Sequence, residues 1–459
     1  MAAQHDVPEG NGGAPATRPM KIVGAACFGH MIEWYEFGVY GYLATVIAKV
    51  FFPAASDSAG LLATLAIFGV AFFARPVGAV LFGNLGDKFG RRTVLASTIL
   101  LMGGSTVLIG VLPTYGQVGV LAPVLIVICR LMQGLSAGGE TSGAATFLAE
   151  YAPQRRRALW ATSIQAVGVI AFVIAALFVA GLTAVLTEDQ LYSWGWRIPF
   201  LMAGPLAGVG LYLRFKIAET PAYQKVQEAA PVKQPSPARE ALVRHWRPIL
   251  LLFAIVTIES VASYTAKTYL PTYLIATVGL SKTTALLTTS ATLVLSAVLV
   301  PCYALLSDRV GRKPLLIGGT VTLFAVSVPS FLMIGSGSVA GAVAGQMLAI
   351  IPGTAISVAV VVMQTELFPT SVRYTGAAIG YNTAYAAFGG SAPFAAAALI
   401  TATGTKLAPG FYFMAIAAVF FVALVKIPET FRRSLSADAD SGFGTGADSA
   451  SSAREQQPA

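Results

Sequence analysis

Long apolar stretches separated by short polar segments occupy most of the chain. The stretches lack the alternating pattern of a membrane β-barrel strand, and each is long enough for a transmembrane helix, which needs about 20 residues. Backbone groups in lipid must find their hydrogen-bond partners within the helix itself. We therefore predict an all-α membrane protein with twelve transmembrane helices, at residues 22–48, 60–83, 93–112, 118–149, 157–186, 196–216, 247–276, 284–306, 315–335, 339–366, 374–401 and 409–428.

The longest internal polar segment divides these spans into two groups of six. Residues 217–246 carry several prolines and charges of both signs, which predicts a cytoplasmic linker with some surface helix. On either side we expect an N-terminal six-helix bundle at 22–216 and a C-terminal six-helix bundle at 247–430. Residues 1–21 and 431–459 are polar and rich in small residues, so we expect them to be disordered cytoplasmic tails.

Two charged motifs occur once in each half. Residues 83–92 (GNLGDKFGRR) resemble residues 304–313 (ALLSDRVGRK), and both follow an apolar stretch. A Glu-x-x-Pro-x-x-x-Arg motif ends the fourth span at 150–157 and the tenth span at 366–373. Both pairs recur at almost the same separation, which indicates a duplicated six-span unit and two pseudo-symmetric bundles.

Composition and charge support a membrane location. Hydrophobic residues make up 56% of the chain and charged residues 11%, whereas soluble domains are about 25% charged. The net charge of +9 comes from Lys and Arg in every second polar segment. This is the pattern of positive cytoplasmic loops, not of a nucleic-acid-binding surface. It predicts a multi-pass membrane protein with both termini in the cytoplasm.

The sequence contains no motif for a disulfide framework, a metal site, a phosphate-binding loop or a catalytic triad. The three cysteines lie in separate apolar stretches and the three histidines are scattered, so neither a disulfide framework nor a metal site is predicted. No phosphate-binding G-x-x-x-x-G-K-[ST] motif and no Ser/His/Asp grouping is present. We expect a protein that is not an enzyme and needs no cofactor.

Several motifs resemble the major facilitator superfamily. The two charged loops and RLMQG at 130–134 are typical of the whole family. EWYEFGVYG at 33–41, ARPVG at 74–78, RLMQGLSAGGE at 130–140 and WGWRIPF at 194–200 resemble its metabolite:proton symporter branch. The resemblance covers about residues 22–430. It implies proton-driven transport of a substrate such as 2-oxoglutarate, citrate, another dicarboxylate, shikimate, proline or glycine betaine. The chain has Glu36 where the branch usually has aspartate, and Ala304 where glycine is usual.

Buried acids and one arginine are the candidates for proton coupling. Glu33 and Glu36 share a face of the first span with Tyr40, and two nearby carboxyls raise each other's affinity for a proton. Arg130 needs a carboxylate partner in lipid, either from the substrate, from a protonatable glutamate, or from a permanent ion pair with Glu33, Glu36 or Glu140. The alternative for the first-span acids is a structural ion pair with an arginine from another helix.

Polar and aromatic residues in other spans are candidates for binding the substrate. Glu259, Ser263 and Lys267 lie on one stripe of the seventh span, and a lysine in a span indicates an anionic substrate unless it pairs with Glu259. Arg75 could bind a substrate or the carbonyl that Pro76 leaves free. Aromatic side chains would instead favour a quaternary ammonium. The candidates are Tyr35, Tyr40, Arg75, Arg130, Gln133, Gln165, Tyr264, Lys267, Tyr381 and Asn382.

The repeated charged motifs are candidates for a gate. In the family that they resemble, such loops join the two halves when the cytoplasmic side is closed. The alternative is that their charges only set the orientation in the membrane. The candidates are Asp87, Arg91, Arg92, Glu150, Arg157, Asp308, Arg312, Glu366 and Arg373.

We therefore predict a monomeric, proton-coupled symporter of a bacterial inner (plasma) membrane that imports a small organic carboxylate by alternating access. The first alternative is a carrier of a zwitterion such as proline or betaine, although the C-terminal tail lacks the heptads of an osmosensing carrier. An exporter is less favoured because the fifth span has no proline, and a membrane enzyme or receptor is least favoured.

Overall fold

The computed structural model describes residues 19–89, 91–138, 152, 156–216, 237–369 and 372–431. The predicted tails lie almost entirely outside these ranges, as does most of the predicted linker. Side chains at 19–27, 83–84, 86–95, 213–216 and 237–239 are also outside the description. All regular structure within the described ranges is helical.

The described helices of the first half form six passes. They are α1 (Pro19–Tyr42) with α2 (Ala44–Phe51), α3 (Asp57–Phe89), α4 (Arg91–Val111), α6 (Leu121–Ala137), α8 (Arg157–Ala161) with α9 (Ser163–Val185), and α11 (Arg197–Leu201) with α12 (Ala203–Lys216). Short helices α5 (Tyr115–Val118) and α10 (Glu188–Gln190) and the π-helix η2 (Leu191–Gly195) connect them.

The helices of the second half, as far as they are described, form another six passes. After α14 (Pro237–Arg244), the seventh pass is α15 (Trp246–Tyr264), π-helix η3 (Thr265–Tyr269), α16 (Leu270–Tyr273) and π-helix η4 (Leu274–Val278). The others are α17 (Lys282–Val310), α18 (Arg312–Ile334), α19 (Val339–Glu366), α20 (Arg373–Ala384) with π-helix η5 (Tyr385–Gly389) and α21 (Ala392–Thr403), and α22 (Ala408–Lys426). Eight of the described helical spans are long and apolar enough to cross a membrane, and residues 96–111 and 121–137 form shorter apolar helices.

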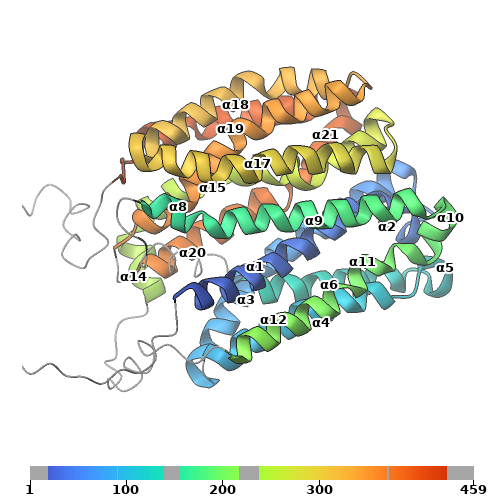
Figure 1. Ribbon diagram of the computed structural model, residues 1–459, viewed down its shortest axis with the longest axis horizontal. Coiled ribbons are helices and arrows are strands. Elements are labelled where there is room, and N and C mark those ends of the chain that lie inside the picture. Colours follow the sequence, from blue (N-terminus) through green and yellow to red (C-terminus); the bar gives the residue numbers. More distant parts are fainter. Residues whose placement is uncertain are drawn as a thin grey trace, which may run out of the picture.

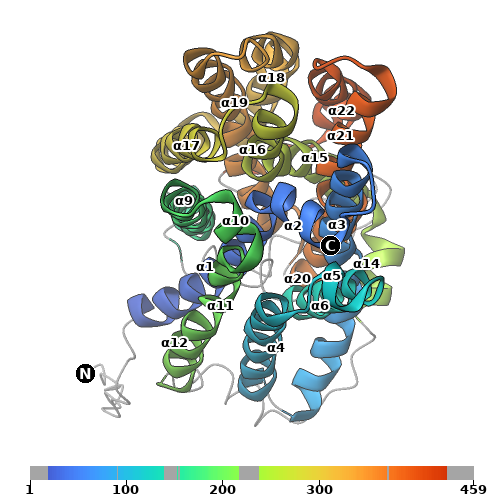
Figure 2. The ribbon, with the colours of Figure 1, turned by 90° about the vertical axis from the view of Figure 1, so that its right-hand side faces the viewer.

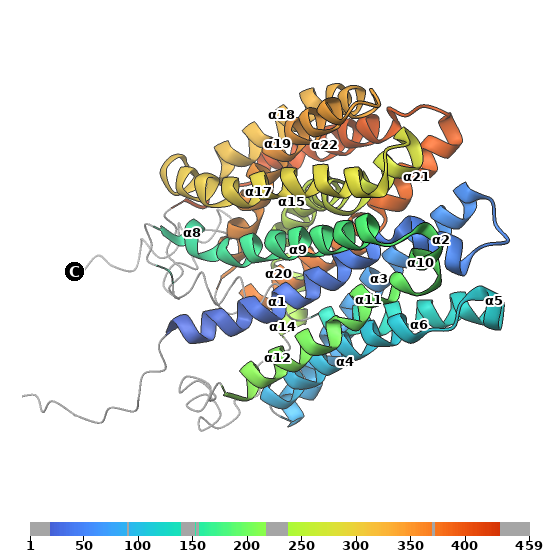
Figure 3. The same cartoon turned by 45° about the vertical axis from the view of Figure 1, so that its right-hand side comes forward.

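The two halves lie side by side along their length. In Figures 1 and 2, α17, α18 and α19 lie on one side of the molecule and α4, α6 and α12 on the other. Between them, α9 packs against both α1 and α17 (Figure 3). Glycines allow the closest approaches. A Cβ atom at Gly134 of α6 would lie 1.9 Å from the carbonyl oxygen of Ala71 in α3, and one at Gly69 of α3 would lie 3.0 Å from the carbonyl oxygen of Gly390.

The charged turns are shorter than the sequence predicts. Helix α3 continues through Phe89, and α17 continues to Val310 before Gly311 turns the chain with a φ of 104°. Polar residues at the end of a span can stay helical because the backbone hydrogen bonds continue wherever no residue interrupts them. The predicted boundaries at 83 and 306 are therefore wrong by one to two turns of helix.

The first pass of each half contains an interruption, and the two interruptions lie close together. Leu43 separates α1 from α2, while η3 separates α15 from α16. A Cβ atom at Gly41 would lie 3.0 Å from the Cβ of Thr268, and the Thr272 hydroxyl donates a hydrogen bond of 3.5 Å to the Gly41 carbonyl. The two first passes thus meet at their breaks.

Candidate functional site

Glu33 and Arg75 form a buried ion pair between α1 and α3. The Arg75 Nη2 atom lies 2.8 Å from Glu33 Oε1, and the guanidinium carbon lies 4.9 Å and 4.6 Å from the ring centres of Phe37 and Phe72. Both residues are almost completely buried. Arg75 therefore contacts a carboxylate rather than the carbonyl freed by Pro76. This contact is the structural ion pair that the sequence left open as the alternative for the first-span acids.

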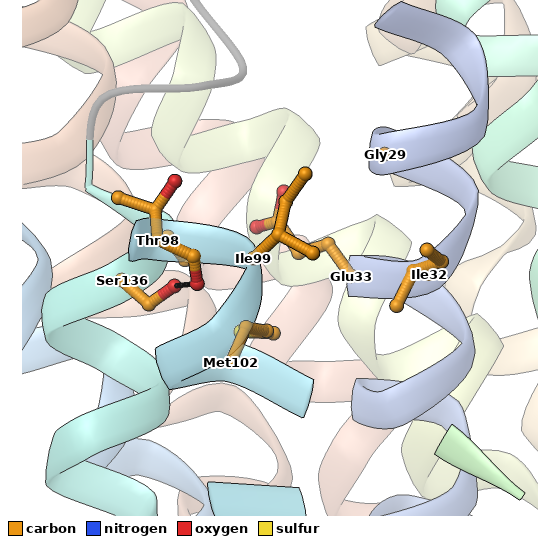
Figure 4. Close-up of a pocket in the computed structure, with 8 residues that line it drawn as sticks. Gly29, Ile32, Glu33, Thr98, Ile99, Met102 and Ser136 are labelled. Atoms are coloured by element: carbon orange, nitrogen blue, oxygen red, sulfur yellow. Dashed lines mark hydrogen bonds between the residues drawn. The ribbon is translucent and has the colours of Figure 1, made fainter. Parts of the chain in front are cut away.

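A small cavity adjoins Glu33. It holds about 20 Å³, enough space for one water molecule. Figure 4 shows Glu33 from α1 together with Thr98, Met102 and Ser136 from α4 and α6. The Ser136 hydroxyl donates a hydrogen bond of 2.6 Å to the Thr98 carbonyl. A proton on Glu33 would therefore have space for a single water beside it.

A chain of hydrogen bonds joins Glu36 to Arg130. The Thr106 hydroxyl donates to Glu36 Oε2, the Gln133 amide donates to the Thr106 oxygen at 2.6 Å, and Arg130 donates to the Gln133 oxygen at 2.8 Å. The other Glu36 oxygen is buried and has no hydrogen-bond partner among the described residues. Glu36 thus lacks a cation at ion-pair distance there and touches Arg130 only through two neutral side chains.

The expected carboxylate partner of Arg130 is not seen. Its guanidinium lies 4.2 Å from the ring centre of Tyr40 and donates to the Phe68 carbonyl at 3.2 Å as well as to Gln133. No carboxylate of the described residues lies within ion-pair distance, and Glu140 is outside those residues. The alternative of a permanent ion pair between Arg130 and Glu33 or Glu36 is therefore wrong. Arg75 occupies the position next to Glu33, and Gln133 is closer to Arg130 along the same helix face.

Aromatic side chains from both halves meet at the centre of the molecule. The Tyr264 ring centre lies 5.9 Å from Trp34, 5.0 Å from Phe72 and 5.5 Å from Tyr385. Tyr381 stacks on Tyr385 at 4.2 Å. Tyr264 is buried and its hydroxyl has no described hydrogen-bond partner. These five residues are called the aromatic cluster. Arg75 already lies over the rings of Phe72 and Trp34, so the tyrosine rings are the ones suited to a further positively charged group.

Glu259 places a carboxylate beside the aromatic cluster. It accepts hydrogen bonds of 2.8 Å from the hydroxyls of both Tyr385 and Ser357. Gln165 of α9 donates to the same Ser357 hydroxyl, so the contact crosses between the halves. The sequence identified Glu259 only as a partner for Lys267. It did not identify Tyr385, although a second tyrosine one turn after Tyr381 was a usable signal.

Lys267 forms no ion pair with a described residue. It is half-buried, and its Nζ lies 5.8 Å from the ring centre of Phe172 in α9. No described carboxylate lies within ion-pair distance of it, so the predicted alternative of a Glu259–Lys267 pair is wrong. The reason is that Glu259 is occupied by two hydroxyls, and η3 changes the helical register between the two residues.

The remaining predicted substrate residues make contacts of other kinds. The Tyr35 hydroxyl donates to the Pro199 carbonyl at 3.1 Å and the Tyr40 hydroxyl to the Thr64 carbonyl at 3.2 Å, both within the first half. Asn382 of α20 donates to the Gly138 carbonyl of the other half at 3.4 Å. Tyr35 and Tyr40 therefore use their hydroxyls to hold helices together.

At one end of the molecule, charged residues connect the two halves; we call this the latch end. The Asp308 carboxylate accepts from the backbone N–H groups of Ala158 and Leu159, at 3.1 Å and 3.3 Å. Arg157 pairs with Glu366 at 3.1 Å, and Arg312 contacts both Asp308 (3.1 Å) and Glu366 (3.3 Å). A carboxylate at a helix N-terminus is stabilised by the exposed N–H groups there.

The other predicted gate residues give less information. Arg373 begins α20 and is buried. The side chains of Asp87, Arg91 and Arg92 and the whole of Glu150 lie outside the description. The described contacts of the latch end are therefore those around Asp308 and Glu366, and not those of the corresponding first-half motif.

Comparison with known proteins gives a consistent picture. Residues 26–392 match the model of the Major Facilitator Superfamily. A proline/betaine transporter of Salmonella typhimurium is 37% identical over 424 residues, which cover 90% of this chain and 84% of the relative. An ectoine/proline transporter of Corynebacterium glutamicum is 36% identical over 421 residues, covering 89% and 83%. The proton:xylose symporter XylE has the same fold, with a TM-score of 0.73 at 19% identity over 92% of this chain and 98% of its own.

Proposed function

Since the chain belongs to the major facilitator superfamily and is a transporter rather than an enzyme, we propose that it carries a zwitterion of the proline or betaine class together with protons. The observation that carries this proposal is the similarity to proline/betaine transporters over nine-tenths of the chain. It favours the zwitterion, which was the alternative prediction, over the small organic carboxylate of the main prediction.

The centre of the molecule suits a zwitterion. The half-buried Lys267 is free to bind a carboxylate, while the aromatic cluster can bind an ammonium group through cation–π attraction. Glu259 adds a negative charge on the same side as the rings. A dicarboxylate would gain from Lys267 but would be repelled by Glu259, and such repulsion contributes to specificity.

We propose Glu36 as the proton carrier. Glu33 is compensated by Arg75, whereas no described cation lies within ion-pair distance of Glu36, whose Oε1 is buried without a described hydrogen-bond partner. An uncompensated charge in a span costs several kcal/mol, and a proton removes it. The chain through Thr106 and Gln133 then lets Arg130 respond to the protonation of Glu36. Glu33, Arg130 and Glu140 complete the proposed proton-coupling group.

Transport would follow from alternating access between the two six-helix halves. In this proposal the latch end is the cytoplasmic end, because the loops there carry the excess of positive charge, and both termini are cytoplasmic. The membrane is the inner (plasma) membrane. The ion pairs of the latch end hold the cytoplasmic side closed and break when the substrate is released.

Uptake into proteoliposomes tests the proposal. We expect accumulation of labelled glycine betaine or proline to increase when the outside is acidified, and unlabelled betaine to compete for it. Excess 2-oxoglutarate should not compete. Competition by 2-oxoglutarate but not by betaine would restore the carboxylate prediction, and accumulation that ignores the proton gradient would exclude symport.

A further inference from the structure

A second hollow lies at the opposite end from the latch end, between the two halves. It has a volume of about 520 Å³, within the roughly 300–1,000 Å³ of small-molecule sites. Its first-half walls come from α2, the start of α3 and η2, and its second-half walls come from η4 and the first residue of α17. We call it the outer cavity. It is separate from the aromatic cluster, none of whose residues line it.

Two lysines from different halves converge on one ring in the outer cavity. Lys49 of α2 places its Nζ 5.5 Å from the ring centre of Tyr192, and Lys282 of α17 places its own 5.3 Å from the same ring. Both lysines and Tyr192 line the cavity, as does Asp57. One tyrosine face does not carry a full negative charge, so a carboxylate beside Tyr192 would be attracted by both lysines.

Glu188 supplies part of that charge from the rim. Its carboxylate accepts a hydrogen bond from Lys282, and this bond lowers the pKa of the Glu188 carboxyl, so that the group stays ionised. However, the Glu188 side chain is 74% exposed, whereas that of Lys282 is 20% exposed. An ion pair this open to water is weak. A carboxylate inside the cavity can therefore replace Glu188 on Lys282.

We propose that the outer cavity is a first binding site for the transported zwitterion, in which Lys49 and Lys282 bind the carboxylate and displace Glu188. Asp57, which also lines the cavity, then faces the ammonium end. Because Lys282 belongs to one half and Glu188 to the other, occupation of the site also removes an ion pair that joins the halves at this end. This inference rests on the proposed function for the identity of the solute.

Protection of an introduced cysteine tests the site directly. Ala55 lines the cavity and is exposed, so Ala55→Cys reports access there, with the parent chain and its own three cysteines as the background. Glycine betaine should slow alkylation of this cysteine by a membrane-impermeant maleimide. Choline, which lacks a carboxylate, should not. The same protection in a Lys267→Ala background would separate the outer cavity from the central site.

Substitutions of the two partners should have opposite effects. Lys282→Gln should raise the betaine concentration needed for half-protection about three- to tenfold, the effect of losing one partly exposed charged contact. Glu188→Gln should lower it, because it removes the competitor for Lys282. Lys406→Gln, a loss of the same charge at an exposed position outside the cavity, is the matched control and should change nothing.

The outcomes separate the two proposals. If Glu188→Gln and Lys282→Gln shift protection in the same direction, the contact is a structural bridge and the outer site is rejected. Equal effects of Lys406→Gln would also reject it. Normal betaine uptake by the parent with no protection at Ala55→Cys rejects the outer site alone. Absence of betaine and proline uptake rejects the proposed function. If protection of Ala55→Cys still requires the carboxylate of the ligand, the outer cavity remains assigned as a carboxylate-binding site.

Discussion

Replacing Asp308 by asparagine should weaken the contact that holds the halves together at the latch end. The carboxylate spans the interface to two backbone N–H groups, at 3.1 Å and 3.3 Å, and its side chain is 5% exposed. Asparagine keeps one acceptor oxygen but loses the charge. The loss combines roughly 0.3–1 kcal/mol for an acid at a helix N-terminus with about half of the 1.5–3 kcal/mol of a charged hydrogen bond.

The expected total is about 1–2.5 kcal/mol, which corresponds to a shift of roughly 5- to 70-fold in the equilibrium between the two conformations. Distances between spin labels on the two halves at the latch end, measured by double electron–electron resonance, report this shift. The fraction of open latch ends should rise in Asp308→Asn.

Glu429 offers a control with the same chemistry inside one half. It accepts from the backbone N–H groups of Arg312 and Lys313, both at 3.0 Å, at the start of α18. Glu429→Gln should lower thermal stability without changing the distances between the halves. If both variants open the latch end equally, or if Asp308→Asn leaves the distances unchanged, then the contact across the interface does not act as a gate.

Other substitutions test the remaining parts of the structure. Glu36→Gln should abolish proton-driven accumulation while betaine exchange continues, and accumulation that still responds to acid would move the proton to another group. Lys267→Ala should raise the KM for betaine about tenfold, because a charged hydrogen bond of about 1.5 kcal/mol is lost, and an unchanged KM would place the carboxylate elsewhere. Gly134→Ala should destabilise the protein by about 1–3 kcal/mol or more, since its Cβ would lie 1.9 Å from the Ala71 carbonyl oxygen. Gly181→Ala, whose Cβ would meet nothing within 4 Å, should leave the melting temperature nearly unchanged.

Much of the fold could be predicted because the signal is local. Apolar stretches give the spans directly, and the repeated motifs give the division into halves. The duplication also led to Asp308, Arg312 and Glu366, which the structure brings together with Arg157. Helix ends were less predictable because a polar residue does not by itself end a helix. The turn at Gly311 ends α17 with a positive φ that favours glycine.

Partner choice within the site was harder, because it depends on how each helix is rotated about its axis. The sequence showed that Glu33 and Arg130 were buried ions but not that Glu33 would face Arg75. Thr106 was missed because a single hydroxyl in an apolar span has many structural uses. The π-helix η3 could not be anticipated from periodicity, and it changed the relation between Glu259 and Lys267.

The neighbouring breaks at Leu43 and η3 have a consequence for how solutes enter. Beyond them lie two short helical segments, α2 in the first half and α16–η4 in the second. Residues of α2 and η4 form walls of the outer cavity that belong to different halves. At each of the two breaks the α-helical hydrogen-bonding pattern changes, so a bend would cost less there than within a regular helix. A solute entering from this side would then require only these two short segments to move apart. The buried ion pair of Glu33 and Arg75 would keep its contacts.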